Sequence, residues 1–232
     1  MLDWGKVWIA KAGEPPACAV PVRGGVPPSG WMDRKTTKEV GSALHDKFRV
    51  KQFIANETED MVKKGNVIGE ELTRIFANNP RLSALVKESK KVLNSIDLVD
   101  KKFLENGIIG RFDPKVDKIQ VAVRGAQTKS ANFRLGKGLA DSSLRGTVRH
   151  EYGHYVRDVL HPERVSKGWW GVWEAHSGEE WAKTVSVYAK TNASEAWAES
   201  FAVYTHPTYG QPGIPRLPID VESFMKKVVT GP

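Results

Sequence analysis

Residues 147–156 of this chain read Thr-Val-Arg-His-Glu-Tyr-Gly-His-Tyr-Val. The stretch places two imidazoles four residues apart, His150 and His154, with the carboxylate of Glu151 beside the first. On a helix, side chains four residues apart lie above one another on the same face, so both imidazoles could reach one metal ion. Neutral imidazole suits zinc, and three protein ligands keep a fourth position for water. The stretch therefore predicts a helix that carries two zinc ligands, with Glu151 facing the open position.

The apolar residues around this motif recur at helical spacing and predict a helix over roughly residues 143–160. Its buried stripe consists of Val148, Tyr152, Tyr155, Val156 and Val159. A cap is expected among residues 141–143, and Pro162 ends the pattern. Gly153 costs about 1 kcal/mol relative to alanine inside a helix, which a close approach by a substrate or a neighbouring strand would explain. Taken alone, the motif could also be a chance match on an ordinary amphipathic helix, so a third ligand is needed.

A second helix is predicted in residues 188–201, which read Tyr-Ala-Lys-Thr-Asn-Ala-Ser-Glu-Ala-Trp-Ala-Glu-Ser-Phe. Its buried stripe consists of Trp197, Phe201 and Tyr204. The cap is Asn192 or Ser194. Glu195 and Glu199 are four residues apart on another face of this helix. Two such carboxylates are either solvated or held by a metal and its ligands.

Together the two segments resemble the C-terminal metallopeptidase domain of anthrax lethal factor, whose relatives occur in bacterial toxins and some phage-encoded proteins. More broadly, they are similar to the thermolysin-like zinc peptidases, the gluzincins. Each of the two motifs matches without internal gaps, their span runs from His150 to Phe201, and no resemblance extends upstream of Leu144. Ala193 stands where lethal factor has an acid, and Trp197 replaces another aromatic residue. These departures bear on the choice of substrate more than on the chemistry.

The resemblance implies a role for each matching residue. The implied Zn²⁺ ligands are His150, His154 and Glu195. Glu151 would be the general base, Tyr188 would assist catalysis, and Glu199 would support a ligand imidazole, most simply that of His150. The implied fold is zincin-like, with a small twisted sheet over the motif helix and the second ligand-bearing helix. Its cleft would lie below an edge strand that pairs with an extended substrate.

The remaining sequence predicts an α+β class. Residues 1–33 are rich in Pro and Gly and form an arm, and residues 34–232 form one domain. Within that domain, helices are expected over about 34–100 and the catalytic part over about 101–232. Strand character begins near Ile108 and predicts a hairpin that turns at residues 113–115. Residues 131–135 predict a third short strand, our candidate for the edge strand.

Composition restricts the class of protein. The chain has 232 residues, a formal net charge of +8 and a single cysteine, Cys18, which excludes an intramolecular disulfide framework. No apolar run is long enough to span a bilayer. The N-terminus does not read as a secretory signal, so the cytoplasm is the default location, with signal-independent export or phage association as alternatives. The basic residues are dispersed, which argues against nucleic acid as a partner.

The expected function is that of a zinc-dependent endopeptidase acting on a protein or peptide substrate. A catalytically inactive metal-binding structural or phage-assembly module is the first alternative, and a basic nucleic-acid-binding protein is the second. Cys18 is either an inert residue of the arm or a thiolate that inhibits by binding the zinc. Four further histidines are expected to be surface or structural residues, although His176 lies in a connection that must pass near the cleft. These are His45, His161, His176 and His206.

Overall fold

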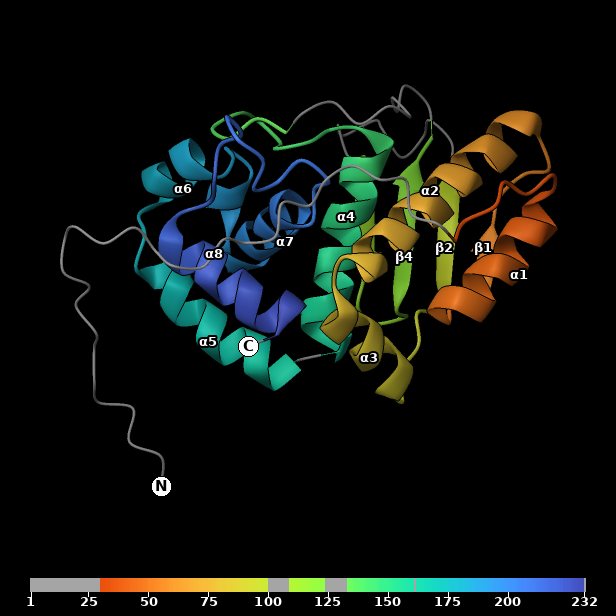
Figure 1. Ribbon diagram of the computed structural model, residues 1–232, viewed down its shortest axis with the longest axis horizontal. Coiled ribbons are helices and arrows are strands. Elements are labelled where there is room, and N and C mark those ends of the chain that lie inside the picture. The colour runs from red at the N-terminus through yellow and green to blue at the C-terminus, as the bar shows by residue number, and fades with distance from the viewer. Residues whose placement is uncertain (1–29, 100–108, 124–132, 161, 232) are drawn as a thin grey trace.

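The computed structural model describes residues 30–99, 109–123, 133–160 and 162–231 (Figure 1). Over these residues the chain is α+β, with eight α-helices and a small mixed sheet of four strands. In chain order these elements are α1 (Thr37–Phe48), β1 (Gln52–Ile54), α2 (Glu59–Ala77), α3 (Pro80–Glu88), β2 (Ser95–Val99), β3 (Gly110–Asp113), β4 (Lys118–Ala122), α4 (Leu144–Tyr155), α5 (Pro162–Glu174), α6 (Gly178–Thr184), α7 (Ala193–Tyr204) and α8 (Ile219–Met225). Cys18 and nearly all of the predicted arm lie outside the described residues. Trp31, near the arm's end, stacks on Phe48 of α1.

The sheet has the strand order β1-β2-β4-β3. β1, β2 and β4 run parallel, and β3 pairs antiparallel with β4 at the edge. Ile96 of β2 is the register partner of Ile119 of β4, and both side chains are buried in the main core. α1 packs against β1, and α4 packs against β3 and β4 (Figure 1). The edge strand therefore lies directly beside α4.

The predicted hairpin is confirmed, because β3 and β4 flank the turn that begins after Asp113. Two other expectations about strands were wrong. β1 and β2 lie in the part expected to be helical. β1 has only three residues, too few for a periodic pattern, and β2 was not recognised as a strand although polar Ser95 and Asp97 alternate with apolar residues in it. Phe133–Leu135 form no strand: the Arg134 amide donates within the loop to the Ala140 carbonyl at 2.9 Å, and Phe133 packs against the rings of His206 and Tyr209. Ala131 and Asn132 lie outside the described residues.

α4 occupies the centre of the fold and confirms the predicted helix. The Ser143 hydroxyl caps it by accepting from the Gly146 amide at 3.0 Å, and a π-helical turn, Val156–Leu160, continues it. Every residue of the predicted apolar stripe is buried. The helix packs against α2 and α7 as well as the sheet, so its polar residues are buried too. Buried polar side chains generally need partners, and Arg149 and His150 of α4 find charged ones on α2 and α7.

α7 crosses α4 at Gly153. The indole nitrogen of Trp197 donates to the Gly153 carbonyl at 2.7 Å, and a Cβ on Gly153 would lie 3.1 Å from the Cβ of Phe201. The close neighbour that requires glycine is therefore a helix, where the sequence suggested a substrate or a strand. The cap of α7 is Asn192, whose side chain accepts from the amides of Ser194 and Glu195.

The Trp-rich connection between the two motif segments is itself largely helical. Pro162, which was expected to stop a helix, is the first residue of α5. Trp169 of α5 and Trp181 of α6 are almost fully buried, with ring centroids 5.6 Å apart. Trp169 also packs against Trp197 of α7, with ring centroids 5.5 Å apart, whereas Trp170 is 54% exposed, so burial accounts for only part of this tryptophan-rich connection. Among the described residues, no helix combines the length and apolar character that crossing a membrane requires.

Candidate metal centre

Three candidate ligand atoms from α4 and α7 converge on one point. Nε2 of His150 and Nε2 of His154 lie 3.2 Å apart, and Oε2 of Glu195 lies 3.1 Å from the first and 3.2 Å from the second. Ligands bound about 2.0–2.1 Å from a tetrahedral zinc ion are themselves about 3.3–3.4 Å apart. The triangle is therefore close to the size that three ligands of one zinc ion require.

The other nitrogen of each imidazole determines where the protons lie. Nδ1 of His150 is 2.7 Å from Oε1 of Glu199, and Nδ1 of His154 is 3.1 Å from Oγ of Ser194. A carboxylate can only accept, so Nδ1 of His150 donates to Glu199, and Nε2 presents a lone pair to the triangle when a metal ion takes the place of the second proton. When His154 donates to Ser194 in the same way, three electron pairs face one another. Such a donor set fits a bound cation, and its chemistry suits zinc.

The electrostatics of the triangle also favour a positive charge. Burial alone would lower the pKa of His150, but hydrogen bonds to Glu195 and Glu199 raise it to about 10. Burial would likewise raise the pKa of Glu195, yet the two imidazoles hold it well below its usual range. The carboxylates thus stabilise a cation at this place, whether it is a proton on His150 or a metal ion.

Glu151 lies beside the triangle without joining it. One of its carboxylate oxygens is within 4.8 Å of a ring nitrogen of each histidine, but among the described residues it makes no hydrogen bond to either imidazole. Because Glu195 contacts both rings directly, it is the better third ligand. Oε2 of Glu151 is buried without a partner in the described part of the chain, and burial raises the pKa of this carboxyl. Such a group can take up a proton.

Gly110 of β3 leaves room for the Glu151 side chain. A Cβ at this position would lie only 2.5 Å from Oε1 of Glu151 and 2.5 Å from Cγ2 of Thr147. A side chain at residue 110 would therefore displace the Glu151 carboxylate or the Thr147 methyl group from its present position. The sequence offered no sign of this contact, since 41 positions separate Gly110 from Glu151.

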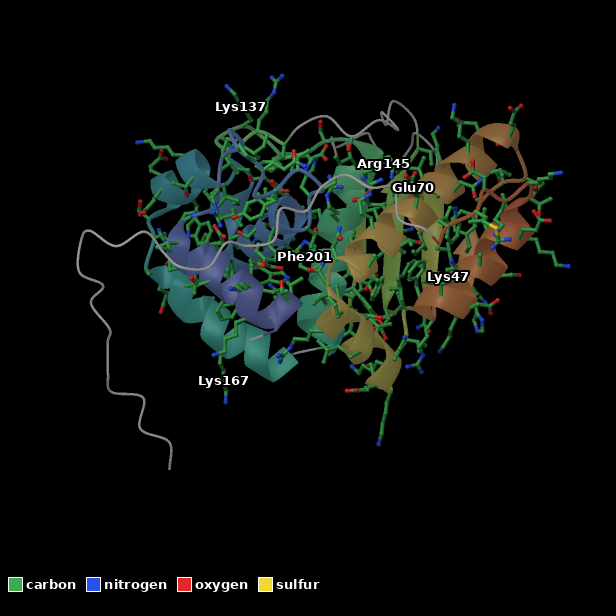
Figure 2. All side chains as sticks on the ribbon, in the orientation of Figure 1. Lys47, Glu70, Lys137, Arg145, Lys167 and Phe201 are labelled. Atoms are coloured by element: carbon green, nitrogen blue, oxygen red, sulfur yellow. The ribbon has the colours of Figure 1, made fainter. Side chains whose placement is uncertain are left out.

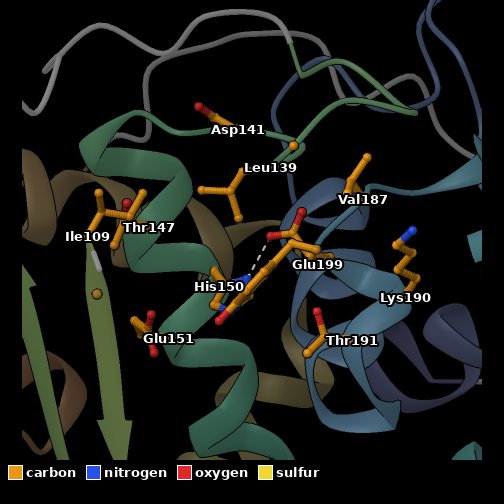
Figure 3. A pocket seen from close by; sticks show the side chains of 13 residues that line it. Ile109, Leu139, Asp141, Thr147, His150, Glu151, Val187, Lys190, Thr191 and Glu199 are labelled. Atoms are coloured by element: carbon orange, nitrogen blue, oxygen red, sulfur yellow. Dashed lines mark hydrogen bonds and ion pairs between the residues drawn. The ribbon is translucent and has the colours of Figure 1, made fainter. Parts of the chain in front are cut away.

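Two adjoining cavities meet over His150, Glu151 and Tyr188. The first has a volume of about 570 Å³ and the second about 380 Å³. Apolar side chains of Leu139 and Val187 line the first (Figure 3). The second is polar, with charged side chains of Arg111, Arg157 and Asp158. None of these five was recognised from the sequence, because they come from separate segments that only the fold brings together.

Tyr188 lies beside His150 and lines both cavities. It precedes a short 3₁₀ turn, Ala189–Thr191, and so stands outside α7. Its ring centroid is 5.8 Å from that of His150, and the residue is 41% exposed in the cleft. Burial and the neighbouring carboxylates, Glu195 first among them, raise the pKa of its hydroxyl to about 12. The phenol therefore keeps its proton at neutral pH and is available as a donor.

Of the four other histidines, the three that the structure describes do not join the centre. His45 is exposed beside Asp46, and His206 is buried against Phe133. His176 lines neither cavity, since its ring contacts Glu180 of α6 through Nδ1 and Asp220 of α8 through Nε2, at 2.8 Å each. His161 lies outside the described residues.

The His176 contacts predict a pH-dependent stability. Burial would lower the pKa of His176, but Glu180 and Asp220 raise it above 6.5. A histidine whose pKa is higher in the folded state stabilises that state fully when the pH is below its pKa in the unfolded chain. This contribution is lost as the pH rises through its pKa in the folded protein. We expect His176→Gln to lower the melting temperature at pH 6 by more than at pH 9. An equal loss at both pH values would show that His176 acts only by packing.

Comparisons with known protein families, with curated proteins and with solved structures find no match to this chain.

Proposed function

We propose that this protein is a zinc-dependent endopeptidase with a zincin-like fold, of the lethal factor-like group within the gluzincins. The observation that carries the proposal is the triangle of His150, His154 and Glu195, with the buried, unpartnered carboxylate oxygen of Glu151 beside it. The intact carboxylate at position 151 favours this function over an inactive metal-binding module, because loss of activity would leave that position without selection for a base.

In this proposal each residue has a separate task. His150, His154 and Glu195 hold zinc, which when bound lowers the pKa of a coordinated water to about 7 and polarises a carbonyl group. Glu151 accepts the proton of the attacking water and later delivers it to the leaving amine. The raised pKa of Glu151 supports both steps. A group that must first accept and then deliver a proton works best when its pKa lies near the operating pH. Glu199 keeps the proton of His150 on Nδ1, so Nε2 stays available as a ligand.

The shape of the cleft supports cleavage within a chain. Glu151 lines both adjoining cavities, so a peptide could extend from the bond that is cut into each of them. β3 is an edge strand of the sheet and crosses directly above Glu151, where an extended peptide could pair with its backbone. The apolar cavity beside Leu139 and Val187 would accept an apolar side chain of the substrate.

The test of the proposal combines metal analysis with peptide digestion. The purified protein should contain about one zinc ion per chain, as expected for a catalytic site with three protein ligands. It should cleave internal bonds in a general peptide library, lose this activity to a chelator and regain it with added zinc. Protein that binds zinc but cleaves nothing in the library would support the structural alternative.

Tyr188→Phe tests the role of the phenol, since it removes one oxygen and leaves the ring in place. A hydroxyl that donates to the oxyanion acts more strongly in the transition state than on bound substrate. We expect kcat to fall by about 10²–10³-fold with little change in KM. Zinc content and melting temperature should stay at the wild-type values. A kcat within about twofold of wild type, too small for a lost donor, would make Tyr188 a packing residue.

A further inference from the structure

A segment ahead of α4 contacts several parts of the metal centre. This bridging segment, residues 136–141, pairs in parallel with residues 185–188. The Gly138 carbonyl accepts from the Tyr188 amide at 2.9 Å, which holds the backbone that carries the phenol. Figure 3 shows Leu139 and Asp141 on this segment above His150 and Glu199, with Leu139 facing the cavity.

The same segment holds Glu199. The Ala140 amide donates to Oε2 of Glu199 at 2.8 Å, while Oε1 of the same carboxylate is 2.7 Å from Nδ1 of His150. Glu199 is only 2% exposed, so little water competes for these bonds. The orientation of the carboxylate, and with it that of the His150 ring, therefore depends on where the Ala140 amide lies.

Asp141 fixes the end of the bridging segment. Its Oδ1 accepts from the Ser143 amide at 2.9 Å, at the cap of α4, and its Oδ2 accepts from Nη2 of Arg149. Nη1 of Arg149 donates to Glu71 of α2, and both Arg149 and Glu71 are completely buried. Breaking a buried ion pair leaves an uncompensated charge, so these groups strongly prefer one arrangement. Asp141 is thus held to the helix that bears both histidines and, through Arg149, to α2.

We propose that Asp141 is a positioning residue of the metal centre. By anchoring the bridging segment to Arg149, it places the Ala140 amide that aligns Glu199 and His150, and the Gly138 carbonyl that holds Tyr188. The expected effects of Asp141 on zinc affinity and catalysis rest on the proposed function, whereas its effect on the position of the bridging segment does not. Asp141 itself lies one contact away from the groups that act on the substrate.

Asp141→Asn tests the proposal with nearly no change in volume. The amide side chain keeps an acceptor for Ser143 but loses the charge opposite Arg149. In zinc-free protein, we expect the amides of Ala140 and Tyr188 to exchange hydrogen faster than in wild type. Zinc affinity should fall by about 10–100-fold, as for the loss of an outer partner of a ligand. kcat should fall with it in zinc-saturated enzyme, while KM changes little.

Two further variants separate positioning from general stability. Glu70→Gln weakens the contacts of Glu70 with Arg74 and Arg145, in the same charged cluster, without touching the bridging segment. It should lower the melting temperature but leave zinc affinity and both exchange rates unchanged. Arg149→Lys keeps a cation next to Asp141 but cannot reproduce the two-pronged contact with Asp141 and Glu71. It should repeat the effects of Asp141→Asn in weaker form, and it replaces that variant if Asp141→Asn does not fold.

The measurements on Asp141→Asn test the anchoring role and the effect on the metal centre separately. Unchanged exchange at Ala140 and Tyr188 in the folded variant would overturn the anchoring role. Faster exchange with zinc affinity within twofold of wild type would overturn the effect on the metal centre. Wild-type protein that neither binds zinc nor cleaves peptides would instead refute the proposed function, and the exchange rates would still report whether Asp141 anchors the segment.

Discussion

Glu151→Gln is expected to lower kcat by roughly 10²–10⁴-fold, the usual contribution of a general base. The amide has nearly the same shape but cannot accept the proton of the attacking water. Zinc content should stay at about one per chain, because Glu151 lies outside the triangle of ligand atoms. Because burial disfavours the charged carboxylate, the neutral variant should melt at the wild-type temperature or slightly above it.

Glu88→Gln is a matched control for this change. Glu88 is exposed at the end of α3, so the same substitution there should leave kcat, zinc content and melting temperature unaltered. Peptide cleavage by Glu151→Gln at more than a tenth of the wild-type rate, too fast for an enzyme without its base, would remove Glu151 from the mechanism.

Glu195→Ala is expected to abolish stable zinc binding. The substitution removes one of three ligand atoms and leaves two imidazoles without the carboxylate that lies 3.1 Å and 3.2 Å from them. We expect the loss of zinc affinity to exceed the 10–100-fold that follows when an outer partner of a ligand is removed. Metal analysis after dialysis should find almost no zinc, and peptide cleavage should disappear with it.

Glu199→Gln provides the comparison that gives this result its meaning. Glu199 contacts His150 on the nitrogen that faces away from the triangle, so its loss should weaken zinc binding only within that 10–100-fold range. Equal zinc content in Glu195→Ala and wild type would show that Glu195 is not a ligand. A larger loss in Glu199→Gln than in Glu195→Ala would exchange the roles of the two carboxylates.

The sequence alone correctly predicted the features whose geometry is set by residues close together in the chain. Four-residue spacing puts His150 and His154 on one face of α4, and the apolar stripe of that helix is buried as predicted. A turn with proline predicted the β3–β4 hairpin correctly. Each of these features depends on neighbours within a few positions along the chain, so periodicity and turn chemistry reveal it.

Tertiary structure decided everything that depends on distance between separate segments. Glu195 and Glu199 look alike in sequence, but only the crossing of α4 and α7 at Gly153 places one at both imidazole Nε2 atoms and the other at Nδ1 of His150. The strand β2 was missed although its sequence alternates polar and apolar residues, and only the fold buries polar Ser95 and Asp97 as deeply as their apolar neighbours. Asp141 reads as a cap in the sequence, yet the fold pairs it with the buried Arg149, because a buried charge is stable only where a partner from another element reaches it.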